Sequence, residues 1–228
     1  MKLLRQTIRK LLLESTSAKI LDAIEIMKSK NLKLNFNLKE GYTPRQIAVF
    51  LYAPTKYDHN RIRTGVPWRE AGYVKTSAAM RHAGDCHDAY EITSTSLHLR
   101  NLRGSGIGAL MYDVAVEIAS MHGFPIMCDR GSVSGDALVM WDYMMNNSAD
   151  YEVLQLDNDE EPFLTPDDPK DDCDPWSFYK DNNPAGSDGY EQQWMASPIT
   201  KAYKKKSLGT IDLVKKEGIF ITDEELGF

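Results

Sequence analysis

A glycine-rich turn that runs directly into a helix constrains the fold more than any other feature of this 228-residue chain. The turn contains Gly104, Gly106 and Gly108, and Arg103 precedes it. Glycine lets the backbone approach a ligand closely, and the first N–H groups of the following helix have no intrahelical acceptor. Because such N–H groups attract anions, the turn favours phosphate binding. The sequence therefore predicts a nucleotide-like ligand.

Apolar residues recur at three- and four-residue spacing after the turn, which predicts an amphipathic helix that ends at Gly123. We expect Asp113, Glu117 and Ser120 on its other, polar face. The short apolar run Phe124–Cys128 then predicts a buried parallel strand. The apolar face of the helix contains Ile107, Leu110, Met111, Val114, Ala115, Ile118 and Ala119.

Several strand-like segments precede the turn, with no helical pattern between them. This order predicts an antiparallel meander that leads into the glycine turn, and a second helix is expected over Gly135–Met145, with Ser132 or Ser134 as its cap. The fold class is therefore α/β (α+β), with a mixed, mostly antiparallel sheet flanked by helices. The predicted strands are Leu32–Leu38, Gln46–Ala53, Ala71–Ala79 and Ala89–Thr95.

Two known motifs fit the turn. Gly104-x-Gly106-x-x-Ala109 matches the dinucleotide-binding fingerprint, with Asp129 where a ribose-binding carboxylate would lie. Arg103-x-x-Gly106-x-Gly108 matches the R/Q-x-x-G-x-G/A loop of the GNAT superfamily of N-acetyltransferases. A Rossmann domain needs a strand that enters the glycines directly, whereas SLHLRNLR intervenes here. The order of elements over residues 32–150 therefore resembles the GNAT fold.

The resemblance implies that acetyl-CoA is the co-substrate and that an amine of unknown identity is the acceptor. It implies that the pyrophosphate is bound by the turn, where Arg100 and Arg103 add charge, and that the pantetheine arm pairs with the preceding strand. The residues so assigned are Thr95, Ser96, Leu97, Arg100, Arg103, Gly104, Ser105, Gly106, Ile107 and Gly108.

The chain departs from the family where many members have N-x-x-A-x-x-x-Y, whose tyrosine protonates the departing thiolate. Here Trp141 occupies the tyrosine position, and Tyr143, about 200° further around the helix, is the remaining candidate acid. Glu91 and His98 are the candidate bases. Alternatively, Glu91 is an outward-facing strand residue, and His98 is a solvated loop residue or makes a satisfied polar contact.

The two ends of the chain differ in charge. Residues 1–31 are expected to be helical, and residues 1–14 resemble capsid-targeting peptides of tailed phages, which end in an apolar-x-Glu site such as Leu12-Leu13-Glu14; the alternative is an ordinary packed helix that continues to Met27. Residues 151–228 are expected to form an acidic, irregular extension of the core at 32–150, because prolines and acidic residues punctuate the stretch to Glu191. Lys201, Lys204, Lys205 and Lys206 are expected to form a solvated surface.

Composition limits the remaining classes. The net charge of −6 and the acidic stretch argue against nonspecific nucleic-acid binding. Three cysteines, without metal-ligand spacing, predict reduced thiols and a cytoplasmic location, here in a bacterial host. Packaging in a virion is the alternative that the resemblance of residues 1–14 implies. No segment has the length of a membrane span, and the acidic spacing at Asp157–Asp168 lacks the glycine of a calcium loop, so no metal site is expected.

These observations together predict an acetyl-CoA-dependent N-acetyltransferase that acts by direct transfer, similar to uncharacterised phage-encoded GNAT-like proteins. Two alternatives remain open at this point. One is a noncatalytic GNAT-fold binding protein or virion-associated protein, because the family tyrosine is missing. The other is a nicotinamide-dependent oxidoreductase, because the dinucleotide fingerprint is also present.

Overall fold

The computed structural model describes residues 18–39, 46–55, 67–78, 89–129, 133–155 and 197–227. The predicted targeting segment 1–14, Ser132, Cys86, Cys173 and most of the acidic stretch lie outside the described residues. None of the helices in the described part of the chain is long and apolar enough to cross a bilayer.

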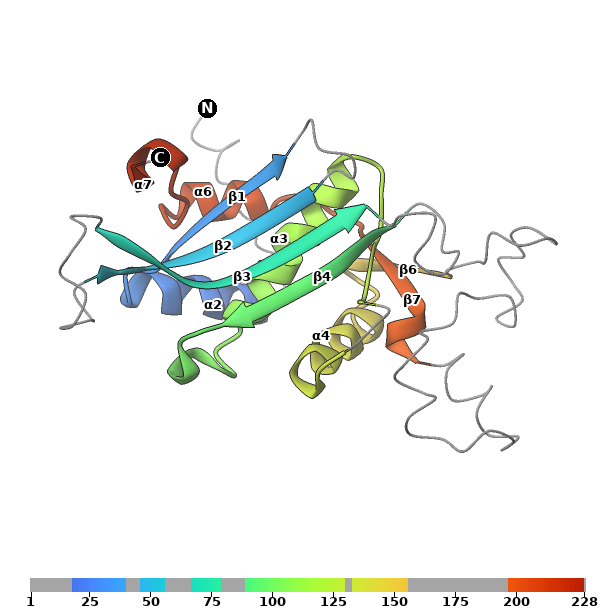
Figure 1. Cartoon of the computed structure of the whole chain (residues 1–228). Helices are drawn as coiled ribbons and strands as arrows, with labels where there is room; N and C mark the ends of the chain where they lie inside the picture. The colour runs from blue at the N-terminus through green and yellow to red at the C-terminus, as the bar shows by residue number, and fades with distance from the viewer. Residues whose placement is uncertain are drawn as a thin grey trace, which may run out of the picture.

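The described strands form one seven-stranded sheet in the order β1-β2-β3-β4-β5-β7-β6 (Figure 1). Only β4 and β5 are parallel, and every other neighbouring pair is antiparallel. This confirms the prediction of a mixed, mostly antiparallel sheet. The strands are β1 (Lys33–Lys39), β2 (Gln46–Pro54), β3 (Trp68–Ala78), β4 (Tyr90–Leu97), β5 (Ile126–Met127), β6 (Tyr151–Gln155) and β7 (Lys201–Lys205).

The long helices cover one face of the sheet. Helix α3 packs on β2, β3 and β7, and α2 packs against α3 (Figure 1). Alternate strand residues such as Leu34, Leu51 and Val74 point to this side and are almost fully buried, as the two-residue period of a strand requires. The helices are α2 (Ala18–Ser29), α3 (Ile107–Met121), α4 (Gly135–Asn146), α6 (Thr210–Lys216) and α7 (Asp223–Leu226), with 3-10 turns η2 (Arg100–Leu102) and η4 (Pro198–Thr200).

The sequence predicted β1 to β4, α3 and α4 to within a few residues. The parallel strand after α3 is confirmed but contains only two residues. Strands β6 and β7 were missed, although both belong to the same sheet as the predicted core. Lys205 was expected to be solvated, and this was wrong: it points into the protein from β7 and is 8% exposed.

The acidic residues of α3 were also placed wrongly. Asp113 and Glu117 were expected on a polar outer face, but they are 1% and 2% exposed. The helix is buried on both sides because β6, β7 and α6 pack against the face that carries these carboxylates. The pattern of a single helix could not reveal these partners, because they lie 38 to 97 positions further along the chain.

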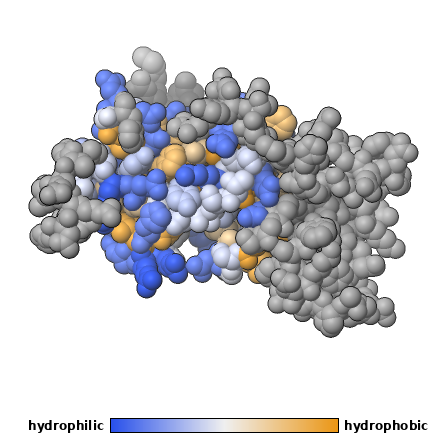
Figure 2. Space-filling model, in the orientation of Figure 1, coloured by the Kyte–Doolittle hydropathy of each residue, from blue (hydrophilic) through white to orange (hydrophobic). Residues whose placement is uncertain are grey.

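No long helix in the described part of the chain covers the other face of β2, β3 and β4. An irregularity in β3 controls which side chains reach this face. In β3, Ala71 is an extra residue between Glu70, which pairs with Tyr52, and Gly72, which pairs with Leu51. Such a bulge shifts the alternation by one residue, so Glu70 lies on the same face as Tyr73. Polar and apolar side chains are mixed over this face in Figure 2.

Candidate functional site

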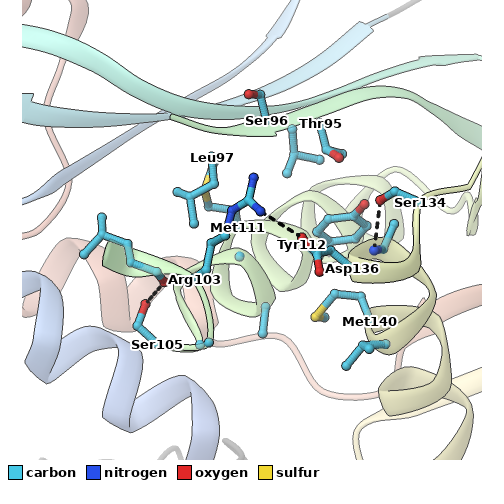
Figure 3. A pocket seen from close by; sticks show the side chains of 18 of the residues that line it. Thr95, Ser96, Leu97, Arg103, Ser105, Met111, Tyr112, Ser134, Asp136 and Met140 are labelled. Atoms are coloured by element: carbon cyan, nitrogen blue, oxygen red, sulfur yellow. Dashed lines mark hydrogen bonds and ion pairs between the residues drawn. The ribbon is translucent and has the colours of Figure 1, made fainter. Parts of the chain in front are cut away.

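A cavity of about 680 Å³ lies between the second half of β4, the start of α3, and α4. Residues of α2, among them Lys19 and Asp22, line one part of it. In Figure 3 the side chains of Thr95 and Leu97 lie on the cavity side of β4, whereas Ser96 lies on the other side of the strand. Three helices and one strand edge therefore meet around a single hollow.

The cavity lies where β4 and β5 separate. The two strands pair only at Tyr90 with Ile126 and at Glu91 with Met127. Beyond Glu91, no strand among the described residues pairs with that edge of β4, while its other edge still pairs with β3 as far as Leu97. Backbone N–H and C=O groups along this edge are therefore available to an extended ligand.

The glycine turn supplies an anion site at one end of the cavity. Gly104 and Gly106 have φ values of 76° and 81°, a region that favours glycine. Gly106 is the N-cap of α3 and provides no side-chain hydrogen bond. The N–H groups of Ile107, Gly108 and Ala109 therefore have no intrahelical acceptor, and the first helical bond runs from Leu110 N to Gly106 O. These groups favour a phosphate.

The two glycines that border the helix start have different tasks. A β-carbon on Gly106 would lie 3.2 Å from the carbonyl oxygen of Lys19 in α2, so this glycine permits close packing of the two helices. A β-carbon on Gly108 would meet nothing within 4 Å, although Gly108 lines the cavity. Gly106 is thus part of the fold, and Gly108 leaves space for a ligand.

Charged side chains stand at the mouth of the cavity. The Arg103 guanidinium lies 3.7 Å from the Asp136 carboxylate of α4, and both side chains are largely exposed (Figure 3). An exposed pair of this kind contributes little stability, so Arg103 can exchange its partner for a phosphate at small cost. Ser134 caps α4 as predicted, because its Oγ accepts a hydrogen bond from Ala137 N at 3.2 Å.

The structure brings together most of the residues predicted to bind the cofactor. All of them except Arg100 and Ile107 line the cavity. Arg100 is exposed in η2, and the side chain of Ile107 is fully buried in the core. The lining residues from the predicted set are Thr95, Ser96, Leu97, Arg103, Gly104, Ser105, Gly106 and Gly108.

None of the three predicted catalytic residues is part of the cavity lining. Glu91 is in the part of β4 that is still paired with β5. Tyr143 is one turn of α4 beyond the lining residue Met140, and its hydroxyl accepts a hydrogen bond from Asn147 at 3.0 Å. Trp141 is 1% exposed and is packed in the core, so α4 presents neither aromatic hydroxyl nor indole to the cavity.

Tyr112 of α3 contributes an aromatic hydroxyl to the cavity lining, as Tyr73 of β3 does, and sequence reasoning missed it. Its ring packs edge-on against Trp141 at 5.7 Å between centroids, and its hydroxyl forms a hydrogen bond with Thr95. Burial raises the pKa of Tyr112 to about 12, and the bond with Thr95 partly opposes this shift. The available signal was helical spacing, because Tyr112 follows Gly108 by four residues and therefore shares its face.

His98, the third predicted residue, lies on the open face of the sheet beside the cavity. Its Nδ1 lies 3.1 Å from Ser96 Oγ, and its Nε2 lies 3.4 Å from Glu70 Oε1. A carboxylate only accepts, so Nε2 carries the hydrogen toward Glu70 and Nδ1 accepts from the Ser96 hydroxyl. The three side chains form a Ser–His–carboxylate chain, which begins at a strand residue of the cavity lining.

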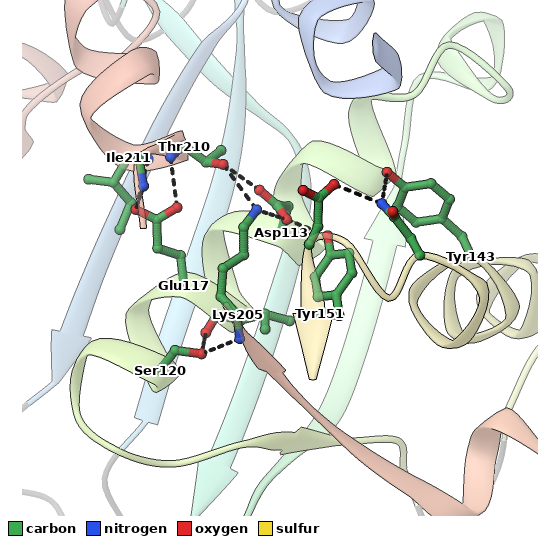
Figure 4. A network of polar contacts seen from close by, with 12 residues as sticks. Asp113, Glu117, Ser120, Tyr143, Tyr151, Lys205, Thr210 and Ile211 are labelled. Carbon is green, nitrogen blue, oxygen red and sulfur yellow. Dashed lines mark hydrogen bonds and ion pairs between the residues drawn. The ribbon is translucent and has the colours of Figure 1, made fainter. Parts of the chain in front are cut away.

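A network of buried polar contacts fixes α3 behind the cavity (Figure 4). Asp113 accepts hydrogen bonds from the Lys205 ammonium, the Tyr151 hydroxyl and, at 2.6 Å, the Thr210 hydroxyl. Glu117 accepts from the backbone N–H groups of Gly209 and Thr210, each at 2.8 Å. Burial raises the pKa of Glu117, whereas these N–H groups and Lys205 act in the opposite direction.

The described residues contain no cluster of three or more histidine, cysteine or carboxylate side chains arranged to hold a metal ion. No protein-family model, curated protein or solved structure matches this chain. The chemistry of the cavity therefore has to be argued from its own residues.

Substitution of the two glycines should separate packing from ligand space. Gly106→Ala should lower the free energy of unfolding by about 1–3 kcal/mol, because φ is positive and the new methyl group meets α2. Gly108→Ala should leave it unchanged or raise it by up to about 1 kcal/mol, because the backbone is ordinary helix and the space is open. Urea denaturation of both variants measures these changes. Equal changes in the free energy of unfolding for Gly106→Ala and Gly108→Ala would contradict the prediction.

The buried ion pair gives a second prediction. Lys205→Met should lower the free energy of unfolding by about 3–5 kcal/mol, because the Asp113 carboxylate then stays buried without its counter-charge. Lys206→Met is the matched control, since this neighbouring lysine is exposed, and its effect should stay within about 0.5 kcal/mol. If urea denaturation shows a similar loss of unfolding free energy for both variants, the Lys205–Asp113 pair does not anchor α3.

Proposed function

We propose that this protein transfers an acetyl group from acetyl-CoA to an amine. The observation that carries the proposal is the position of the cavity: it begins at the uncapped glycine turn of α3 and continues along the unpaired edge of β4. An anion site followed by an open strand edge suits a ligand that has a diphosphate at one end and an amide-containing arm beyond it.

The arrangement of strands supports the same choice. A four-stranded antiparallel meander, one parallel pair around the cavity and a final antiparallel pair of strands are similar to the GNAT fold, which the Arg103-x-x-Gly106-x-Gly108 motif suggested. A nicotinamide-dependent enzyme of the Rossmann class would have a largely parallel sheet, whereas the described sheet has a single parallel pair. The topology thus favours a coenzyme A ligand over NAD.

Each part of acetyl-CoA has suitable partners in the cavity. The N–H groups of Ile107, Gly108 and Ala109, together with Arg103, would hold the pyrophosphate. The edge of β4 at Thr95–Leu97 would pair with the amides of the pantetheine arm. When bound, acetyl-CoA supplies an activated acyl carbon, so the protein needs only to position the acceptor and to manage one proton and one developing charge.

His98 is the proposed base. An attacking amine forms a bond to the acyl carbon, loses a proton and breaks the carbon–sulfur bond. Ser96 Oγ passes that proton to Nδ1 of His98, and Glu70 stabilises the resulting imidazolium through its contact with Nε2. The proton therefore ends on Nδ1 of His98, and no acyl-enzyme intermediate forms.

Tyr112 is the proposed partner of the departing sulfur. A pKa of about 12 means that Tyr112 keeps its proton at neutral pH and can donate a hydrogen bond to a thiolate as negative charge develops. The thiolate and the imidazolium then exchange protons with water. Tyr112 therefore replaces the tyrosine that the α4 motif lacks, and it does so from the neighbouring helix.

Coenzyme A binding is the first test of the proposal. Calorimetry should detect binding of acetyl-CoA and free CoA, and Gly108→Trp should weaken it at least tenfold because the new side chain fills the cavity. Met121→Trp, at the exposed far end of α3, is the matched control and should bind normally. Binding of NAD in place of CoA, or normal binding by Gly108→Trp, would overturn the assignment.

Catalysis is tested through the two proposed proton partners. Release of free CoA with amine acceptors should fall about 100-fold in kcat for His98→Ala and for Tyr112→Phe, with little change in CoA affinity. His122→Ala, an exposed histidine at the end of α3, is the control. Mass spectrometry should find no acetyl group on Ser96, and an acetylated Ser96 that turns over would replace direct transfer with a covalent route.

A further inference from the structure

The open face of the sheet carries opposite charges on the two sides of one aromatic ring. Along β3 the same face presents Lys75, Tyr73 and, because of the bulge at Ala71, Glu70. His98 lies between Glu70 and the ring, 3.4 Å from the carboxylate and 5.8 Å from the Tyr73 centroid. The face is therefore negative at Glu70, beside the proposed base, and positive at Lys75, two residues along β3 from Tyr73.

Lys75 is a positioned cation. Its ammonium lies 4.3 Å from the Tyr73 centroid and 5.4 Å from the Phe50 centroid, so two ring faces hold it by cation–π attraction. Lys75 is not a member of any ion pair within the described residues. The aromatic rings therefore hold the Lys75 ammonium in place, and the ammonium can still pair with an anion.

The spacing of the charges limits what can bridge them. Because the Lys75 ammonium is 4.3 Å and the His98 ring is 5.8 Å from the same Tyr73 centroid, the two groups are at most about 10 Å apart. A molecule that lies in line between them and makes a hydrogen bond of about 3 Å to each has at most about 4 Å between its amine and its anion. Groups on one carbon atom or on neighbouring atoms have that spacing.

We infer that the acceptor is a free α-amino acid. Its ammonium group lies beside the Ser96–His98–Glu70 chain, against Glu70 and the Ser96 hydroxyl, and loses a first proton to water before the amine attacks. Its carboxylate pairs with Lys75, and Tyr73 forms the surface beneath. This inference rests on the proposed acetyl transfer and names the acceptor of that same site. Simple amines lack the carboxylate, a peptide N-terminus has an amide in its place, and ω-amino acids place the two charges too far apart.

The unpaired edge of β4 links this acceptor surface to the cavity. Ser96 belongs to both, because it is part of the cavity lining and its hydroxyl bonds to His98 on the open face. Tyr73 pairs with Ser96 across the β3–β4 ladder, so an amino acid bound over Tyr73 has its amine beside Ser96. The pantetheine arm would lie along the opposite, unpaired edge of the same strand segment.

The experiment measures release of free CoA from acetyl-CoA with matched acceptors: L-phenylalanine with phenethylamine, L-alanine with ethylamine, and each amino acid with its amide and with 5-aminopentanoate. We expect kcat/KM for at least one amino acid to exceed that of its amine, its amide and the ω-amino acid at least tenfold. Equal rates across any matched set that is accepted would overturn the inference.

Lys75→Met then tests the cause of the preference. Methionine keeps the stem against the rings and removes the charge, so the ratio of kcat/KM for the amino acid to that for its amine should fall at least tenfold. Lys30→Met, at the exposed end of α2, should leave this ratio unchanged. An unchanged ratio in Lys75→Met would also overturn the inference, since the carboxylate would then bind elsewhere.

The outcome is separable from the proposed function. If the protein binds acetyl-CoA, loses it in Gly108→Trp, and acetylates only amines without a carboxylate, the transferase proposal stands and the amino-acid inference fails. If it binds no coenzyme A, both fail. Calorimetry of the free protein with the same amino acids gives a readout that needs no turnover, and weaker binding to Glu70→Gln and Lys75→Met is expected there.

Discussion

The burial of two carboxylates on α3 is the constraint on which the rest of the structure depends. A buried carboxylate without partners is costly, so Asp113 and Glu117 require donors from other parts of the chain. Lys205 of β7, Tyr151 of β6 and the start of α6 supply them. The carboxylates thereby tie the C-terminal elements to the helix whose first turn forms the anion site.

This anchoring has a direct bearing on the cavity. Two of the donors, Tyr151 and Lys205, belong to the antiparallel strands β6 and β7. Strand β7 in turn pairs with β5, so the position of β5 depends on the same network. The short β4–β5 contact then leaves β4 free from Ile92 onward. A helix fixed at its middle and a strand released beyond its second residue create the hollow without any specialised loop.

Much of the fold could be predicted from the sequence because the patterns that indicate it are local. Alternation identified β1 to β4, helical spacing identified α3 and α4, and the glycine pattern located the anion site. What escaped prediction depends on distant residues: Lys205 looked solvated because Asp113 lies 92 positions away. Likewise, Glu70 reaches His98 only because an extra residue in β3 changes its face, and alternation rules assume that no such residue is present.

The bulge at Ala71 couples the two surfaces of the sheet. The extra residue places Glu70 on the open face and also sets which residues of β3 point toward α3. Moving that single insertion along the strand would turn every side chain between the old and the new position to the opposite face. A change in what the open face recognises by this route therefore requires matching changes in the hydrophobic interior, so the two surfaces must evolve together.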